Sequence, residues 1–189
     1  MVLEDLTRPF KHPCICDMKM GTRQHGDDAP ADKRFRHQNK VLTTTSLPLG
    51  VRLCGIQNYQ IGSKSYKYTS KYDGRKLKHD TIKDAIADFF NNGATFRMDA
   101  LSQFVDRLKS FYKVMEGVKD KFRFYSTSLL MVYEGDPDSP PQINIKMIDF
   151  AHTFAMADSD VNDDGYLFGL SNLIDLMEQI LKEHGTSEL

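Results

Sequence analysis

Three charged residues of the sequence are of the types that handle phosphate groups. Asp17 and Lys19 stand two positions apart in the segment Pro13–Gly21, and Asp149 ends an apolar run just before Phe150. A lysine neutralises phosphate oxygens, and a carboxylate at the end of a strand suits a Mg²⁺ ion that bridges nucleotide phosphates. If the fold brings these three side chains together, their chemistry indicates phosphoryl transfer.

The segment Pro13–Met20 is expected to be a strand that places Asp17 and Lys19 side by side on one face. The other face carries Cys14, Cys16, Met18 and Met20. The three cysteines of the chain are an odd and sparse set, which predicts no disulfide framework. The Cys-x-Cys pair also lacks the second pair that a closed zinc site needs. We therefore expect both thiols of this strand to pack in the core.

A basic helix is expected next, with its start at Asp27–Ala31. The basic residues that share one face of it are Lys33, Arg36, His37 and Lys40, with Arg34 beside them. Each phosphate monoester carries roughly −1.5 to −2 charges near neutral pH, so a compact polyphosphate needs several converging cations. The alternative is a face that is merely solvated, which is the commoner meaning of such a pattern.

The remaining pattern predicts the elements that position these residues. In chain order they are a turn at Ser46–Gly50, a strand over Val51–Ile61 with Val51, Leu53 and Ile56 turned inward, two helices from Thr81 separated by Asn91–Gly93, strands over Arg123–Gly135 and Gln142–Phe150, and a last helix over Leu167–His184. The two late strands are joined by the turn-rich segment Asp136–Pro141. Ser63–Asp80 shows no clear pattern.

Asp149 is expected to share a strand face with Ile143, Ile145 and Met147. A carboxylate in an apolar row is costly without compensation, so it should meet a cation or a metal ion. Two plainer interpretations stay open. Asp149 could cap the following helical turn, and Asp17 with Lys19 could form a surface ion pair that contributes little.

The composition is that of one soluble globular domain, with 189 residues, 40% of them hydrophobic and 27% charged. The net charge of −1 gives no overall field that would attract nucleic acid or a membrane, so a polyanion site must be a local cluster. The basic face also lacks stacking aromatics beyond Phe35, which disfavours a nucleic-acid partner. No signal peptide and no apolar run of roughly 18 to 20 residues is present, so we expect a cytoplasmic or nuclear monomer without a membrane partner.

Three ordered motifs resemble those of the inositol polyphosphate kinases. Pro13-Cys-Ile-Cys-Asp17-Met-Lys19-Met-Gly21 matches the P-x-x-x-D-x-K-x-G signature of that family, while Thr127-Ser128-Leu129-Leu130 and Ile148-Asp149-Phe150 resemble its S-S-L-L and I-D-F motifs. Within the family, the segments most similar to inositol hexakisphosphate kinases are Thr22–Asp28, Lys71–Leu77 and Asp149–His152. The resemblance covers essentially the whole chain.

The resemblance implies an α+β fold, the kinase-like C-terminal lobe of this family, with antiparallel strands and flanking helices over residues 1–189. Within it, residues 1–6 would be the hinge, 24–45 a substrate-binding helical segment and 122–150 a hairpin that carries the metal-binding aspartate. Asp17, Lys19 and Asp149 would be catalytic, with ATP and Mg²⁺ as cofactors and Asp149 as the metal ligand. Asp17 would also contact the nucleotide, and the backbone of Glu4, Asp5 and Leu6 would bind adenine. The implied substrate-binding residues are Lys19, Lys33, Arg34, Arg36, His37, Lys40 and His152, with Ser128 supporting the metal environment.

The implied activity is ATP-dependent phosphorylation of inositol polyphosphates, from inositol hexakisphosphate to a diphosphoinositol product. An inositol trisphosphate kinase or multikinase is the alternative within this class. Members of the family carry a small N-terminal lobe with a phosphate-gripping lysine before the hinge, whereas this sequence begins at the expected hinge, and no G-x-G-x-x-G or P-loop motif replaces that lobe. A lobe that binds inositol polyphosphates without transferring phosphate is therefore a third possibility.

Overall fold

A five-stranded antiparallel sheet forms the centre of the molecule. The computed structural model describes residues 4–139, 141–156 and 164–185. The sheet has the order β3-β2-β1-β5-β6, so that β1, the strand of Asp17 and Lys19, is its middle strand. Its strands are β1 (Pro13–Met20), β2 (Val51–Gln60), β3 (Ser65–Thr69), β5 (Ser128–Glu134) and β6 (Ile143–Ile148).

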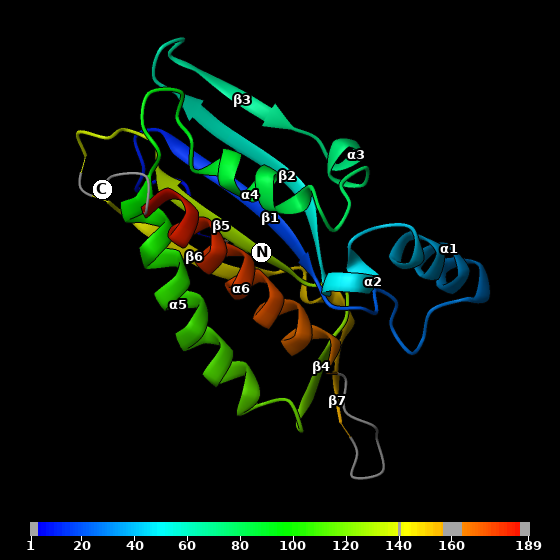
Figure 1. Cartoon of the computed structure of the whole chain (residues 1–189). Helices are drawn as coiled ribbons and strands as arrows, with labels where there is room; N and C mark the ends of the chain where they lie inside the picture. The colour runs from blue at the N-terminus through cyan, green and yellow to red at the C-terminus, as the bar shows by residue number, and fades with distance from the viewer. Residues whose placement is uncertain (1–3, 140, 157–163, 186–189) are drawn as a thin grey trace.

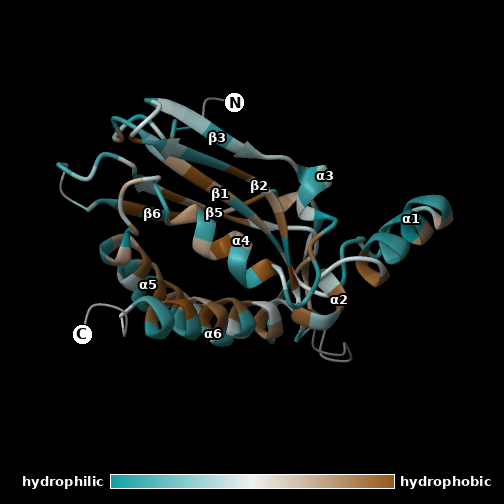
Figure 2. Ribbon diagram, turned by 45° about the horizontal axis from the view of Figure 1, so that its top comes forward, coloured by the Kyte–Doolittle hydropathy of each residue, from teal (hydrophilic) through white to brown (hydrophobic). Residues whose placement is uncertain are grey.

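Three helices cover one face of this sheet (Figure 1). They are α4 (Ile82–Phe89), α5 (Met98–Glu116) and α6 (Gly165–Gly185). The core lies between them and the sheet, where hydrophobic residues concentrate (Figure 2). Cys14 and Cys16 are 0% and 1% exposed on this side, which confirms that their thiols belong to the core. None of the described helices is long and apolar enough to cross a membrane.

The smaller elements gather at the Met20 end of β1 (Figure 1). They are α1 (Ala31–Leu42), α2 (Ser46–Leu49), α3 (Lys71–Gly74), the 3-10 helix η1 (Phe150–His152), and the two-stranded sheet of β4 (Phe122–Phe124) with β7 (Thr153–Ala155). Helix α1 projects away from the body and is largely hydrophilic (Figure 2). The predicted strands and helices occur in the predicted order, including the last helix, together with short elements that were not predicted.

A β-bulge in β2 sets which of its side chains face the core. Asp17 pairs with Gly55 and Met18 with Leu53, so Cys54 has no partner on β1. The extra residue shifts the alternation by one, which lets both Leu53 and Ile56 point inward as predicted. On the other side of the bulge, Arg52 pairs with Lys19, and both side chains belong to the face that α4, α5 and α6 leave open.

Three segments differ from the sequence-based expectations. The single strand predicted over Arg123–Gly135 is split into β4 and β5, because Ser126 adopts a left-handed conformation with φ +58° between them. Ser46–Gly50 holds the short helix α2, which ends where Gly50 takes φ +65°. Ser63–Asp80, which had no clear pattern, contains the edge strand β3 and the short helix α3.

The predicted placement of Asp149 in an apolar strand row was wrong. Strand β6 ends at Ile148, and Asp149 takes a left-handed conformation with φ +67° that turns the chain. Its carboxylate therefore does not continue the row of Ile143, Ile145 and Met147. Asp149 stands at the N-cap of η1 but makes no capping hydrogen bond with its side chain, so the structure does not support a capping role.

Helix α3 lies directly against β2 because residue 74 has no side chain. A Cβ atom at Gly74 would stand 2.2 Å from the carbonyl oxygen of Leu53, a distance that real Cβ atoms do not adopt. Since the obstructing atom is backbone, either α3 or β2 would have to move. The position of α3 relative to the open face of the sheet thus depends on this glycine.

We expect Gly74→Ala to lower the free energy of unfolding by about 1–3 kcal/mol, the usual cost of overpacking. Gly62→Ala is the matched control, because a Cβ at Gly62 would meet nothing within 4 Å. Urea titrations of both variants would measure the difference. Equal midpoints for the two variants would show that the approach of α3 to β2 is not constrained.

Candidate active site

A cavity of about 320 Å³ lies on the open face of the sheet near the Met20 end of β1. Strands β1 and β2, helices α1 and α3, and the connection between β4 and β5 all contribute to its walls. The residues that line it are Asp17, Lys19, Gln24, His37, Lys40, Arg52, Cys54, Lys71, Arg75 and Ser126. Five of these are lysines or arginines and only one is a carboxylate, so the cavity is built for an anion.

The cations of this cavity lie close enough to affect one another. Burial, followed by the charges of Arg52 and Arg75, lowers the pKa of Lys40. Mutual repulsion of this kind is unfavourable in the free protein and is relieved when a polyanion binds. The arrangement therefore favours a ligand with several negative charges over a single carboxylate.

Among the cations of the cavity, Arg52 gives the strongest indication of an anionic ligand. The residue is 4% exposed, and its Nη1 atom is buried without a hydrogen-bond partner in the described part of the chain. A buried guanidinium group with an unsatisfied donor costs free energy, and an anion in the cavity would supply the missing acceptor. Sequence reasoning missed Arg52: the inward Val51 and Leu53 already put it on the opposite face, but the sequence does not show that β2 pairs with β1 and sets Arg52 opposite Lys19.

Lys71 and Arg75 were also missed as site residues. They belong to α3 and its C-cap, which Gly74 seats against β2. The segment Lys71–Leu77 was noted in the sequence only for its resemblance to inositol hexakisphosphate kinases, and its residues were given no role. The sequence feature that could have identified Lys71 and Arg75 is the density of lysine and arginine around Gly74.

Lys19 connects the cavity with Asp149. Its Nζ atom donates a hydrogen bond to the carbonyl oxygen of Ser126 at 2.7 Å and lies 3.3 Å from Oδ2 of Asp149. The side chain of Lys19 is mostly buried, whereas that of Asp149 is 61% exposed and open to a further ligand. This confirms the expectation that Asp149 meets a cation. The partner of Lys19 is Asp149 rather than Asp17.

Asp17 lines the same cavity as Lys19, and its ionised form is electrostatically unfavourable. Burial raises the pKa of its carboxyl group, and the nearby charge of Asp149 adds to the effect, while Ser128, Lys19 and Arg52 oppose it. Its Oδ1 atom is buried without a hydrogen-bond partner among the described residues. A dehydrated carboxylate oxygen beside a second carboxylate is a donor set that suits a hard cation such as Mg²⁺.

The two carboxylates fit a metal that takes its remaining ligands from elsewhere. Within the described residues, no group of three or more histidine, cysteine or acidic side chains is placed to hold a metal ion. Magnesium is typically bound through one or two carboxylates together with substrate phosphates and water. Asp17 and Asp149 match that pattern, and Ser128 lies beside them because it pairs with Lys19 across β1 and β5.

Only part of the predicted basic face of α1 belongs to the cavity. Lys33, His37 and Lys40 are half-buried, whereas Arg36, at the edge of the same face, is exposed, and its role stays a prediction. Arg34 is also exposed, and its Nη2 donates to the carbonyl oxygen of Asp27 at 3.4 Å.

Two histidines of the predicted set make contacts that connect α1 with other segments of the chain. The ring of His37 contacts the carbonyl oxygen of Gln24, and burial lowers the pKa of its imidazole. Lys33 Nζ lies 3.2 Å from Nε2 of His152 in η1. The Lys33–His152 pair does not line the 320 Å³ cavity. The predicted substrate residues are therefore divided between the cavity and its surroundings, and their roles stay predictions.

The predicted adenine-binding residues lie apart from the cavity. Glu4, Asp5 and Leu6 precede the Pro13 end of β1, and Met1–Leu3 lie outside the described residues. The carboxylate of Asp5 accepts hydrogen bonds from the amide and hydroxyl of Thr7 at 2.9 and 2.7 Å. From Pro13 to Lys19 the strand rises about 20 Å. A nucleotide that reached from Glu4–Leu6 to the cavity would run along β1. Adenine binding by Glu4, Asp5 and Leu6 stays a prediction.

The chain belongs to the inositol polyphosphate kinase family, whose model matches residues 1–178. Inositol hexakisphosphate kinase 3 of Mus musculus is 38% identical over 200 residues, which cover 95% of this chain and 50% of the relative. Inositol hexakisphosphate kinase 2 of Homo sapiens is 36% identical over 223 residues, which cover 98% of this chain and 52% of the relative. The chain thus spans about half the length of these relatives.

Solved structures of the family share the fold. The inositol phosphate multikinase Ipk2 of S. cerevisiae, in complex with ADP and Mn²⁺, superimposes with a TM-score of 0.82 at 28% identity, covering 95% of this chain and 82% of the multikinase chain. A second inositol phosphate multikinase structure gives 0.84 at 26% identity, with 95% and 85% covered. The predicted kinase-like α+β lobe of antiparallel strands and flanking helices is confirmed.

We expect Asp17→Asn to raise the stability of the free protein at pH 7 and to have little effect near pH 3.5. Burial raises the folded pKa above the ordinary value of 3.8, so between these two values the native state holds a proton that the unfolded chain has lost. Stability therefore falls as pH rises through this window, and the neutral amide avoids the loss. A gain of up to about 1 kcal/mol would raise Tm by about 2–4 °C.

Asp99→Asn provides a control of opposite sign, because the hydrogen bond from Arg97 lowers the pKa of Asp99. That variant should lose stability at pH 7, and its deficit should shrink as pH falls through the depressed folded pKa. Thermal melts from about pH 2.5 to 7.5 measure both differences, because the change for Asp99 occurs below its ordinary pKa of 3.8. A destabilised Asp17→Asn at pH 7 would mean that the ionised carboxylate is compensated in the free protein.

Proposed function

We propose that this chain is the substrate-binding and metal-binding lobe of an ATP-dependent inositol polyphosphate kinase. Its preferred acceptor is inositol hexakisphosphate, and its product is a diphosphoinositol. The observation that carries the proposal is the cavity in which Lys19, Lys40, Arg52 and two cations of α3 converge beside Asp17 and Asp149. Family membership and similarity to the inositol hexakisphosphate kinases support it.

The charge of the cavity fits an acceptor with many phosphates. Six phosphate monoesters carry on the order of −10 charges near neutral pH, more than the five cations of the cavity neutralise. The half-buried Lys33 and the exposed Arg34 belong to α1, the helix that contributes His37 and Lys40 to the cavity, and they would meet phosphates that extend beyond it. An acceptor with three phosphates would leave more of these cations without a partner.

The site residues divide the work of phosphoryl transfer between them. Lys19 would neutralise the transferred group at the boundary between acceptor and nucleotide, since it faces the cavity and contacts Asp149. An acceptor phosphate already has an ionised oxygen, so no strong base is needed. Asp17, with its raised pKa, would accept the proton if the acceptor were a hydroxyl group.

Asp149 would hold Mg²⁺, joined by Asp17 when the acceptor is a phosphate and no base is needed; the ion supplies charge neutralisation at the nucleotide phosphates when it is bound. The presence of ADP and Mn²⁺ in the related multikinase structure supports a nucleotide and a divalent metal for this chain. A cytoplasmic or nuclear location, a monomeric state and the absence of a nucleic-acid partner remain proposals from the sequence.

The direct test is transfer of ³²P from ATP to inositol hexakisphosphate, with Asp149→Asn as the inactive variant. We expect Asp149→Asn to lower kcat by about a hundredfold or more, as loss of a metal-bound charge does, while binding of inositol hexakisphosphate is retained. Binding without any turnover by the unmodified chain would instead support a lobe that only binds the ligand. Faster transfer to free hydroxyls of inositol trisphosphate would favour the multikinase alternative.

A second test compares two arginines that differ in placement. Arg52→Ala should weaken binding of inositol hexakisphosphate by about tenfold or more, since a charge-assisted hydrogen bond contributes roughly 1.5–3 kcal/mol. Arg36→Ala removes the same charge from the exposed side of α1 and should weaken binding by about threefold or less. Calorimetry at fixed ionic strength measures both. Equal losses would show that the buried position of Arg52 has no special role.

A further inference from the structure

Among the described residues, Cys54 is the one cysteine that lies outside the core. Cys14 and Cys16 are 0% and 1% exposed, whereas Cys54 is half-buried and lines the open face of the sheet. It is the extra residue of the bulge in β2 and has no partner on β1. The proposed function gives this thiol no role, although the thiolate form of cysteine is a strong nucleophile.

Cys54 lies where two cavities meet. It lines the cavity of Lys19, Lys40 and Arg52, here called the cation cavity, and also a neighbouring cavity of about 320 Å³ over β1, β2 and β3. Asp17 and Cys54 are the lining residues that the two cavities share. The neighbouring cavity is otherwise lined by Ile15, Gly55, Ile56, Gln57, Tyr68 and Thr69, all uncharged. A group attached to the Cys54 sulfur therefore has room to extend over the sheet while its charges reach the cations.

The charge around Cys54 is positive. Five lysines and arginines line the cation cavity, against the single carboxylate of Asp17. Burial, followed by the charges of Arg52 and Arg75, lowers the pKa of Lys40, and a negative charge on Cys54 opposes that effect. Lys40 and a thiolate at Cys54 thus attract one another. The same field draws anionic reagents toward the sulfur and repels cationic ones.

Arg52 gives a second indication of an anion at this place. It stands two residues before Cys54 on β2, is 4% exposed, and its Nη1 atom has no hydrogen-bond partner in the described part of the chain. An acceptor inside the cation cavity would satisfy this donor. A carboxylate held on the Cys54 sulfur would be such an acceptor. A thiol reagent that carries carboxylates therefore fits the site better than an uncharged one.

We propose that Cys54 is a site of reversible covalent modification by anionic disulfides such as glutathione disulfide. The Cys54 thiolate attacks one sulfur of the disulfide, whose S–S bond breaks while a new S–S bond joins Cys54 to one glutathione. The second glutathione leaves as a thiolate and takes up the proton that the cysteine has lost. Cys54 is oxidised and one half of the reagent is reduced, so no further oxidant is needed. The carboxylates of the attached glutathione meet the cations of the cavity.

The modification excludes phosphate ligands from the cation cavity. A glutathione attached to Cys54 occupies the space in which an inositol polyphosphate would bind, so the two exclude one another. This consequence rests on the proposed function, whereas the preference of the thiol for anionic reagents does not. A small free thiol such as dithiothreitol removes the modification by the same exchange reaction.

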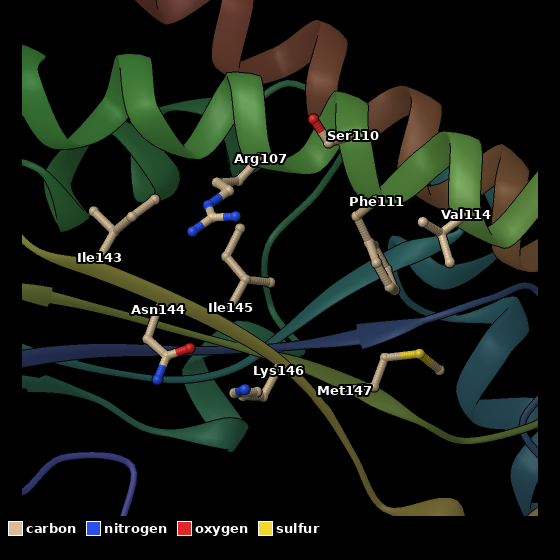
Figure 3. Close-up of a pocket in the computed structure, with 9 residues that line it drawn as sticks. All are labelled: Arg107, Ser110, Phe111, Val114, Ile143, Asn144, Ile145, Lys146 and Met147. Atoms are coloured by element: carbon tan, nitrogen blue, oxygen red, sulfur yellow. The ribbon is translucent and has the colours of Figure 1, made fainter.

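The first test compares an anionic methanethiosulfonate, which carries a sulfonate, with a cationic one, which carries a trimethylammonium group. Ser110→Cys combined with Cys54→Ser is the matched control. Ser110 is exposed on α5 and lines the cavity of about 340 Å³ between α5 and β6 (Figure 3), where Arg107 and Lys146 are the charged lining residues. Intact-mass measurements give the rate of each reaction. Dividing the anionic-to-cationic rate ratio of Cys54 by that of the control removes the intrinsic difference between the reagents.

This quotient should be about fivefold or more at low salt and should shrink as the ionic strength rises. A quotient of one or less would overturn the proposal, because the cation cavity would then exert no selection on the reagent. A preference that does not change with salt would also contradict it.

The second test incubates the whole chain with glutathione disulfide and maps the modified peptide by mass spectrometry. We expect one glutathione on Cys54, its loss after dithiothreitol, and no adduct in Cys54→Ser. Saturating inositol hexakisphosphate should slow the addition by about tenfold or more, and the modified chain should bind this ligand about tenfold more weakly or worse. No adduct, or an adduct on Cys14 or Cys16 instead, would contradict the proposal.

The two tests separate this proposal from the proposed function. If Cys54 selects anionic reagents but the unmodified chain does not bind inositol hexakisphosphate, the proposed function fails and the modification site stands. If the ligand binds but neither slows the addition nor loses affinity for the modified chain, the modification does not close the cavity and the proposal is wrong.

Discussion

The contact between Lys19 and Asp149 joins the two halves of the site. The middle strand of the sheet contributes the lysine, and a left-handed turn after the edge strand β6 contributes the carboxylate 3.3 Å away. Because β1 is held by β2 on one side and β5 on the other, Lys19 has little freedom to move. Under the proposed function, a pair of this kind would place an acceptor phosphate and a metal-bound nucleotide phosphate next to one another, which is the main requirement of phosphoryl transfer.

The electrostatics of the open face are unfavourable in the free protein and suited to a ligand. Arg52 has a buried donor without an acceptor, Asp17 has a buried oxygen without a donor, and Lys40 has a lowered pKa among other cations. Local conflicts of this sort typically mark functional sites, where stability is given up for binding. The helix-covered face shows the opposite character, since the side chains of β1 there are buried and apolar. One strand thus serves both the core and the site.

Much of this arrangement was predictable because strand alternation and helical spacing are local properties. The alternation of β1 predicted which of its residues belong to the core and which to the site, and the I-D-F motif singled out Asp149. The placement of Asp149 was wrong, since alternation cannot reveal that a non-glycine residue adopts a positive φ. Arg36 is exposed although its neighbours Lys33 and Lys40 are half-buried, which was not predictable because the sequence shows which residues neighbour one another on a helix but not which side faces the body. Arg52 was missed because the sequence does not show that β2 pairs with β1, and Lys71 and Arg75 were missed because a close approach at Gly74 places them.

The most direct measurement is the thermal stability of the chain with and without inositol hexakisphosphate over a range of salt concentrations. A ligand that binds only the native state stabilises it by RT ln(1 + [L]/Kd), so relief of the cation repulsion should appear as a rise in Tm. The account predicts a rise of several degrees at low salt that shrinks as ionic strength increases, and no rise with uncharged inositol. No stabilisation by the hexakisphosphate at low salt would contradict it.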